Sequence, residues 1–319
     1  VDVAVVGHFA NSQAQAAVGC NGPIINLIIN LFIGISVGSN VIIANYIGGR
    51  EKDKIRDAVH TTMTVSFISG VILLVLGITI ARPVLVLMDT PEDVLEYAVL
   101  YLRIYSLGMP FIMVYNFGAA ILRSIGDTKR PLYCLVLSGL INAGLNLFLV
   151  IVFHLDVAGV AIATVISNVV SACMVWRFLM KESDPIRLSF RKLKMSKSEL
   201  VRMLRIGMPA GLQGMVFSIA NVCIQAALNG YGSDAVAGSA VALNFEYFTY
   251  FVISAFNQTS VTFTSQNYGA AQYDRCRKVH RFCLISGLLI TAVMCFIFIA
   301  GKGIFISLFT SDPDVAAYA

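Results

Sequence analysis

IIANYIGGREKDKIRDAVH, at residues 42–60, places four basic side chains in a short gap between two long apolar runs. Along the chain, every second gap between apolar runs is basic in this way. Of the 23 lysines and arginines, only Arg82, Arg103 and Lys302 lie outside these basic gaps. A membrane imposes this alternation on a protein that crosses it many times, because cytoplasmic loops carry an excess of lysine and arginine. The pattern therefore predicts a multi-pass membrane protein whose basic gaps are cytoplasmic.

The composition supports the same class. Hydrophobic residues make up 57% of the chain and charged residues only 13%, with a mean hydropathy of +0.79, whereas soluble domains average roughly 25% charged residues. The formal charge of +5 is explained by the loops and by contact with anionic membrane lipid, so no nucleic-acid partner is implied. Eight stretches have the ~20 residues that a spanning helix needs: 24–46, 59–81, 97–122, 131–153, 157–180, 206–229, 236–265 and 282–309.

The halves of the chain resemble each other. Residues 181–205 read as a cytoplasmic linker between an N-terminal lobe, residues 1–180, and a C-terminal lobe, residues 206–319. TSQNYGAAQYDRCRKVH at 264–280 resembles the opening stretch at a constant shift in number, which predicts two parallel repeats. Because the chain starts at Val and stops as a new segment begins, we interpret it as a fragment. The matching residues are Gly48, Asp53 and Arg56 in the first copy and Gly269, Asp274 and Arg277 in the second.

Two carboxylates fall within predicted membrane segments, where ionisable groups are costly and are functional candidates by default. Asp2 lies in the outer half of the first, incomplete segment, where burial favours its protonated form. The alternative is that Asp2 caps a truncated helix. Glu246 lies about a third of the way along residues 236–265, and it either takes part in transport or contacts water in an open cleft.

Neutral polar residues form two further candidate groups. Asn142 and Asn146 are four residues apart on one helix face, and Thr164 follows a short outer turn. Together they could coordinate a small cation or bind a carboxylate, and hydrogen bonding between helices is the competing interpretation. Asn221 and Gln225 belong to a stripe that suits either a wet cavity wall or packing.

Small residues recur every four positions in the first complete segment. Asn26 and Asn30 are followed at this spacing by Gly34 and Gly38. Small residues at this spacing let helix backbones approach closely, which predicts a packing seam.

Seven stretches together resemble a known family: VDVAVVG (1–7), QAAVG (15–19), GISVGSNVIIANYIGG (34–49), ILRSIGDTKRP (121–131), GVAIATVISN (159–168), IGMPAGLQ (206–213) and SQNYGA (265–270). On these stretches the chain resembles the multidrug and toxic compound extrusion (MATE) transporters, closest to the branch that includes the DinF-like bacterial proteins. The resemblance implies an all-α fold of twelve helices in two six-helix lobes, here incomplete. It also implies export of cationic or amphipathic drugs in exchange for H+ or Na+, as a monomer in the cytoplasmic membrane and without cofactor, metal or enzymatic activity.

The resemblance also assigns roles to residues. It implies that Asp2 couples transport to the ion, with Asn142, Asn146 and Thr164 completing the site. Some relatives carry an aspartate where this chain has Asn146, so the N-terminal lobe has one carboxylate fewer. The sodium-type relatives carry a glutamate at about the position of Phe217, which disfavours sodium coupling through that site. The substrate cavity is predicted to include Asn30, Asn221, Gln225 and Glu246.

Two other functions compete with drug export. A flippase for lipid-linked saccharides would need a basic cavity for the pyrophosphate, and only Arg103 lies well inside a segment. A membrane-embedded enzyme would need clustered acids, bases or metal ligands, and the four histidines lie at helix ends or in loops without ligand spacing. An ion-driven antiporter is therefore the favoured interpretation.

Overall fold

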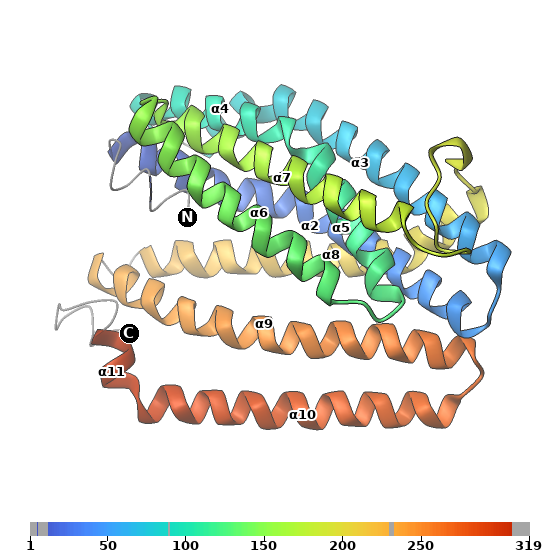
Figure 1. The fold of residues 1–319 in the computed structure, drawn as a ribbon. Helices are drawn as coiled ribbons and strands as arrows, with labels where there is room; N and C mark the ends of the chain where they lie inside the picture. The colour runs from blue at the N-terminus through green and yellow to red at the C-terminus, as the bar shows by residue number, and fades with distance from the viewer. Residues whose placement is uncertain (1–4, 6–11, 89, 230–232, 308–319) are drawn as a thin grey trace. The chain divides into compact units, whose positions relative to one another are not determined.

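The computed structural model describes all residues except 1–4, 6–11, 89, 230–232 and 308–319, and every regular element among the described residues is helical (Figure 1). The chain divides into two compact units, Val1–Met215 and Val216–Ala319, with the boundary inside α8. The helices are α2 (Ser12–Gly48), α3 (Lys52–Leu87), α4 (Glu92–Leu107), α5 (Met109–Ser124), α6 (Lys129–Leu147), the π-helical turn η1 (Phe148–Val152), α7 (Asp156–Met180), the 3-10 turn η2 (Phe190–Lys192), α8 (Lys197–Asn229), α9 (Ser233–Gly269), α10 (Tyr273–Ala300) and α11 (Lys302–Ser307).

Most of the stretches predicted as membrane spans form helices of the expected length and apolarity, but α8 and α9, which contain the predicted spans 206–229 and 236–265, are not among the described helices that are apolar enough. Within the described residues, five helices are long and apolar enough to cross a membrane, or six if the bent pair α4–α5 counts as one span. This pair occupies the stretch predicted as a single span at 97–122, but its two helices meet at an angle of 47°. Pro110 explains the bend, because proline has no N–H to continue the helical hydrogen bonds and its ring clashes with the preceding turn.

The loops after α2 and after α9 have the same backbone structure, which supports the duplication predicted from their sequences. In the first loop Arg50 has a positive φ of 56°, and in the second Ala271, at the matching position, also has a φ of 56°. The N–H of Glu51 donates to the Tyr46 carbonyl at 3.0 Å, as that of Gln272 donates to the Asn267 carbonyl at 2.8 Å. The two loops, which match at only three residues in sequence, thus share the same turn geometry.

The close approach predicted for Gly34 and Gly38 is confirmed, and the partner is the first half of α8. A Cβ added to Gly34 would lie 2.1 Å from the backbone nitrogen of Gly211, and one added to Gly38 would lie 2.4 Å from the Met203 carbonyl oxygen. Such contacts leave no room for any side chain at these positions. Within the first unit, α2 and α8 therefore touch backbone to backbone.

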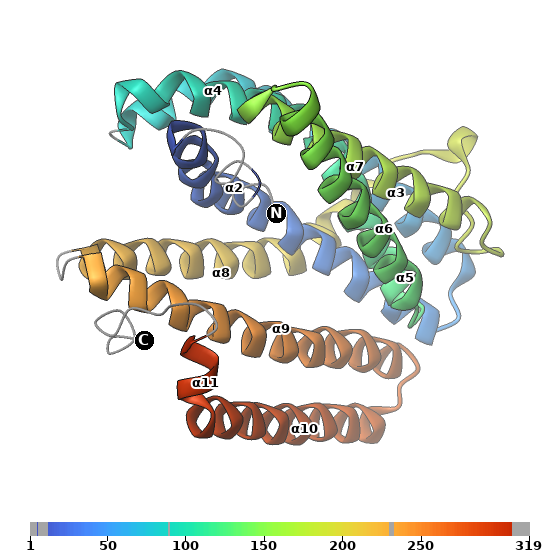
Figure 2. The same ribbon diagram turned by 60° about the vertical axis from the view of Figure 1, so that its left-hand side comes forward.

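The first unit contains the better packed core. Figure 2 shows α6 and α7 lying side by side, with α5 beside them. Phe117 and Met113 on α5 are completely buried, and Trp176 on α7 packs edge-on against Phe67 of α3 with ring centroids 5.3 Å apart. The bundle thus holds α6 and α7 in a fixed rotation, which positions the polar residues described below.

The second unit is built around the neighbouring helices α9 and α10 (Figure 2). Phe245 on α9 packs against Phe298 on α10 with ring centroids 5.2 Å apart, and Phe305 of α11 contacts both rings. Much of α10 exposes large apolar side chains, Phe296 and Ile299 among them. Apolar exposure of this extent suits lipid rather than water.

Asp127 organises the loop between α5 and α6. Its Oδ1 accepts hydrogen bonds from the backbone N–H groups of Lys129 at 3.0 Å and Arg130 at 3.1 Å, and its Oδ2 pairs with the Arg130 guanidinium, which also contacts Glu182. Burial alone would raise the pKa of Asp127, but these hydrogen bonds together hold that pKa below its usual value. The ionised carboxylate therefore stabilises the folded state.

Asp127→Ala is expected to lower the free energy of unfolding by about 2 kcal/mol at neutral pH, because it removes several hydrogen bonds to a charged group. Since the folded-state pKa is lowered, this contribution is present above the unfolded-state pKa and is lost as the pH falls through the folded-state value. Thermal unfolding in detergent at neutral and acidic pH measures both effects. The control is Asp53→Ala, whose side chain is 96% exposed. Equal losses in the two variants, or a loss that does not shrink in acid, would contradict this role for Asp127.

Candidate functional site

The first unit contains an open cavity of about 550 Å³ lined by residues of four helices. Its wall is composed of small, aromatic and neutral polar side chains, and no Asp, Glu, Lys or Arg is among the described residues that line it. The lining residues are Val18, Gly22, Ile25 and Asn26 of α2, Tyr101 and Tyr105 of α4, Leu135, Ser138, Gly139 and Asn142 of α6, and Thr164 and Ser167 of α7.

Three of the residues predicted to form the ion site lie together at this cavity. The amide nitrogen of Asn142 donates to the Thr164 hydroxyl at 3.1 Å, and the amide nitrogen of Asn146 donates to the Asn142 carbonyl oxygen at 3.2 Å. Asn146 is completely buried, whereas Asn142 and Thr164 are half-buried and reach the cavity. This polar row, Asn146–Asn142–Thr164, links a buried amide to the cavity wall.

The connection between α6 and α7 brings the row together. After Leu147 the helix widens into the π-helical turn η1, and His154 and Asp156 then take positive φ values of 52° and 40° in a tight reversal. The Leu155 N–H donates to the Leu149 carbonyl at 3.2 Å and closes this turn. A short reversal makes α6 and α7 antiparallel neighbours, so residues equally far from the turn face each other. Asn142 and Thr164 meet for this reason.

Two tyrosines also line the cavity. The rings of Tyr101 and Tyr105, one helical turn apart on α4, stack with centroids 5.8 Å apart and an interplanar angle of 30°. Tyrosine faces carry a negative electrostatic potential and attract cations. The cavity lining therefore combines an aromatic pair with hydrogen-bonding groups.

The remaining predicted site residues lie elsewhere or outside the description. Asp2 lies outside the described residues. Asn30 is half-buried on α2 beside Gly214 of α8, away from the cavity lining. Asn221 on α8 and Glu246 on α9 are exposed in the second unit. Gln225 lies within α8, and its side chain is not among those described.

A second polar cluster joins α2 to α8 next to the basic loop. The hydroxyl of Tyr46 donates to Glu199 Oε2 at 2.8 Å and accepts from an Arg202 guanidinium nitrogen at 2.6 Å. Glu199 is only 5% exposed, so its carboxylate depends on these partners. The cluster lies about two turns along α2 from Gly38 and adds polar contacts to the glycine contact between the same helices.

The sequence reasoning missed the two tyrosines and the serines of the cavity. A signal was available, because Ser138 lies four residues before Asn142 and Ser167 three residues after Thr164, which places each pair on one helix face. The Tyr46–Glu199–Arg202 cluster gave no comparable signal, because its members come from segments far apart in the sequence.

The comparison with protein families gives the decisive observation. The MatE family model matches two stretches of the chain, residues 1–148 and 209–319. The chain belongs to the MATE family. Members of this family are multi-pass membrane transporters, so this MATE chain is a transporter of the cytoplasmic membrane rather than an enzyme. The match leaves out residues 149–208, which contain α7, most of η1 and the whole linker.

Individual MATE relatives agree with this assignment. The chain is 30% identical to the probable multidrug resistance protein YoeA of Bacillus subtilis, over 98% of this chain and 69% of the relative. It is 23% identical to the multidrug export protein MepA of Staphylococcus saprophyticus, over 100% of this chain and 70% of that protein. A crystal structure of a MATE protein in a bent conformation matches with a TM-score of 0.88 at 24% identity, over 99% of this chain and 71% of the other, which shows the shared fold.

Proposed function

We propose that this MATE protein is a monomeric secondary antiporter that exports cationic or amphipathic organic compounds in exchange for H+ or Na+. The observation that carries the proposal is the cavity of the first unit, whose lining combines stacked tyrosines with the Asn142 and Thr164 end of the polar row. The relatives YoeA and MepA, named for multidrug resistance and multidrug export, support the same class of substrate.

The chemistry of the cavity favours a flat, singly charged organic cation. The faces of Tyr101 and Tyr105 attract a cation and stack on an aromatic ring, while the lining offers no fixed positive charge to repel it. A flippase would instead have to neutralise a pyrophosphate, for which this lining supplies no lysine or arginine. Ethidium, a flat aromatic cation, is therefore the probe of choice.

Asp2 supplies the proposed coupling to an ion gradient, as the resemblance implies. A carboxylate that binds a proton or a sodium ion in one arrangement of the helices, and releases it in the other, links release of the ion to uptake of the substrate. The neutral polar row would assist by hydrogen bonding, because without a charge of its own it holds a cation weakly. One carboxylate implies one coupling ion at this site.

Ethidium export from everted membrane vesicles tests the proposal, with the full-length protein energised first by a proton gradient and then by a sodium gradient. We expect proton-driven export that is abolished by an uncoupler. Export driven by sodium alone would move the coupling site away from Asp2. No export under either gradient, with the protein present and folded in the vesicles, would refute the antiporter.

A further inference from the structure

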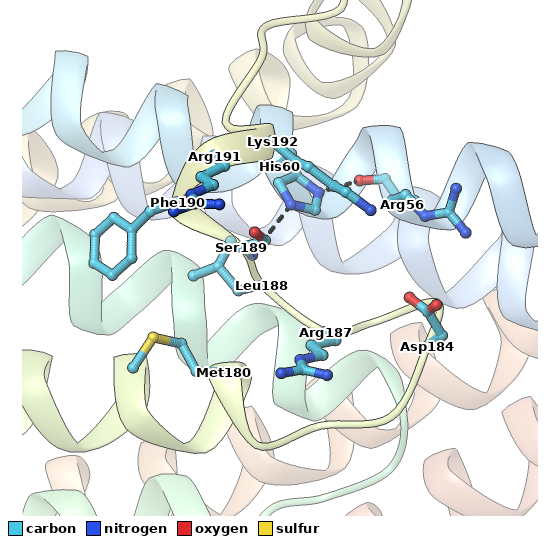
Figure 3. A pocket seen from close by; sticks show the side chains of 10 residues that line it. All are labelled: Arg56, His60, Met180, Asp184, Arg187, Leu188, Ser189, Phe190, Arg191 and Lys192. Atoms are coloured by element: carbon cyan, nitrogen blue, oxygen red, sulfur yellow. Dashed lines mark hydrogen bonds between the residues drawn. The ribbon is translucent and has the colours of Figure 1, made fainter.

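A second cavity, of about 440 Å³, lies outside the transport site, between α3, the end of α7 and the linker. Figure 3 shows its side chains, with Arg56 and His60 coming from α3 and the others from the end of α7, the linker and η2. By the alternation of basic gaps this end of the bundle is cytoplasmic. The cavity therefore lies at the depth of the inner leaflet's headgroups or just below it.

The wall of this cavity is fixed in place by buried contacts. His60, which is almost completely buried, bonds through Nδ1 to the Arg56 carbonyl at 2.8 Å and through Nε2 to the Ser189 N–H at 3.3 Å (Figure 3). Leu188 is buried beside it, and the ring of Phe190 packs on Trp176 with centroids 4.6 Å apart. The linker is thus held against α3 and α7 and forms a defined pocket.

The charge of the pocket is strongly positive. Arg56, Arg187, Arg191 and Lys192 line it, and Asp184 is the one carboxylate among its described lining residues. Within the described part of the chain, no carboxylate lies at ion-pair distance from Arg187, Arg191 or Lys192. Cations gathered in one pocket repel one another, so an anion would relieve an unfavourable arrangement.

Two features point to a particular anion. The Nε of Arg56 is buried and has no hydrogen-bond partner, although a buried donor without a partner is costly. Another nitrogen of the Arg56 guanidinium lies 3.6 Å from the exposed carboxylate of Asp53, whereas Arg130 at the same end of the bundle pairs with two carboxylates. Arginine donors match the oxygens of a phosphate group particularly well, because the guanidinium presents its N–H groups in a planar fork.

An apolar border adjoins these cations. Phe190 is 60% exposed and Met180 37% exposed, and both line the cavity. A free phosphate gains nothing from such a border, whereas a phospholipid places acyl chains beside its headgroup. The combination of arginines, aromatic ring and depth matches the inner surface of a membrane with anionic lipid.

We propose that the pocket between α3, the end of α7 and the linker binds a phosphate group, carried by an anionic phospholipid of the cytoplasmic leaflet. The bound lipid joins the linker to the first unit. Neutralising the arginines of the linker is expected to weaken this binding by about tenfold or more, because each lost arginine removes a charge-assisted hydrogen bond.

Lipid-dependent thermal stabilisation of the purified full-length protein tests the proposal. Dioctanoyl phosphatidylglycerol is titrated into wild type, into Arg187→Gln/Arg191→Gln, and into Lys181→Gln/Lys194→Gln. The last variant loses the same charge from the same linker, but neither of its exposed lysines lines the pocket. We expect saturable stabilisation of wild type and of the lysine variant, and at least about tenfold weaker binding by the arginine variant.

Further probes distinguish the source of the phosphate. Dioctanoyl phosphatidylcholine, glycerol phosphate and inorganic phosphate are expected to stabilise only weakly. Saturation by glycerol phosphate or inorganic phosphate at the same concentration as the lipid would overturn the lipid assignment. Equal weakening in the two double variants, or no stabilisation of wild type by phosphatidylglycerol, would overturn the site. Arg187 and Arg191 are exposed, so the lipid-free stability of their variant is expected to stay unchanged.

Discussion

Gly34→Ala is expected to destabilise the protein by about 3 kcal/mol, the upper part of the range for overpacking a close contact. Even the smallest side chain at this position would place its Cβ 2.1 Å from the backbone nitrogen and 2.3 Å from the Cα of Gly211. Backbone atoms cannot rotate away as the end of a side chain can, so α2 and α8 would have to separate. Separation would also stretch the hydrogen bonds of Tyr46 to Glu199 and Arg202.

Gly144→Ala is the matched control for this prediction. Gly144 also lies inside a long helix, but a Cβ added to it would meet nothing within 4 Å. Alanine is a better helix former than glycine, so this variant is expected to gain about 0.5–1 kcal/mol. Thermal unfolding of both variants in detergent decides the point. Shifts of the same sign and size would mean that α2 and α8 do not touch as described.

Asn142→Leu is expected to lower ethidium export by about thirtyfold while leaving the amount of protein in the membrane unchanged. Leucine is close to asparagine in size, but it cannot donate to Thr164 or accept from Asn146. Each lost bond leaves a polar group in an apolar surrounding, at a cost of about 1–3 kcal/mol, and 1.4 kcal/mol corresponds to tenfold. The leucine would also replace a polar group of the cavity lining with an apolar one.

Leu140→Ala provides the control on the same helix. Leu140 is 67% exposed and does not line the cavity, so its truncation is expected to leave export within about twofold of wild type, as surface changes usually do. Initial export rates, normalised to the amount of folded protein, measure both variants. An Asn142→Leu protein that exports at the wild-type rate would exclude the polar row from transport.

The sequence predicted those helices, turns and contacts that depend on residues close together in the chain. The helices followed from the apolar runs, and the repeated loop followed from a few matching residues whose turn geometry is the same in both copies. The contact between Asn142 and Thr164 could be predicted because only one tight reversal separates their helices. A short connection leaves few ways for two helices to pack.

Contacts between distant segments could not be predicted in the same way. Which face of α4 points toward α6 depends on how the whole bundle packs, so Tyr101 and Tyr105 gave no sign that they line the cavity. The 47° angle at Pro110 likewise depends on the neighbouring helices. The basic pocket exists because His60 and Leu188 hold the linker against α3 and α7. The number of basic residues in the sequence does not predict that the linker folds back onto these helices.

The most direct test of the account measures proton release when ethidium binds to the purified full-length protein in weakly buffered detergent solution. The account predicts that wild type releases protons on binding ethidium and that Asp2→Asn releases none, because substrate and proton compete for arrangements that differ at this carboxylate. Asn142→Leu is expected to bind ethidium more weakly but to release the same number of protons per ethidium bound. Undiminished proton release by Asp2→Asn, or ethidium binding by wild type without any release, would contradict proton exchange through Asp2.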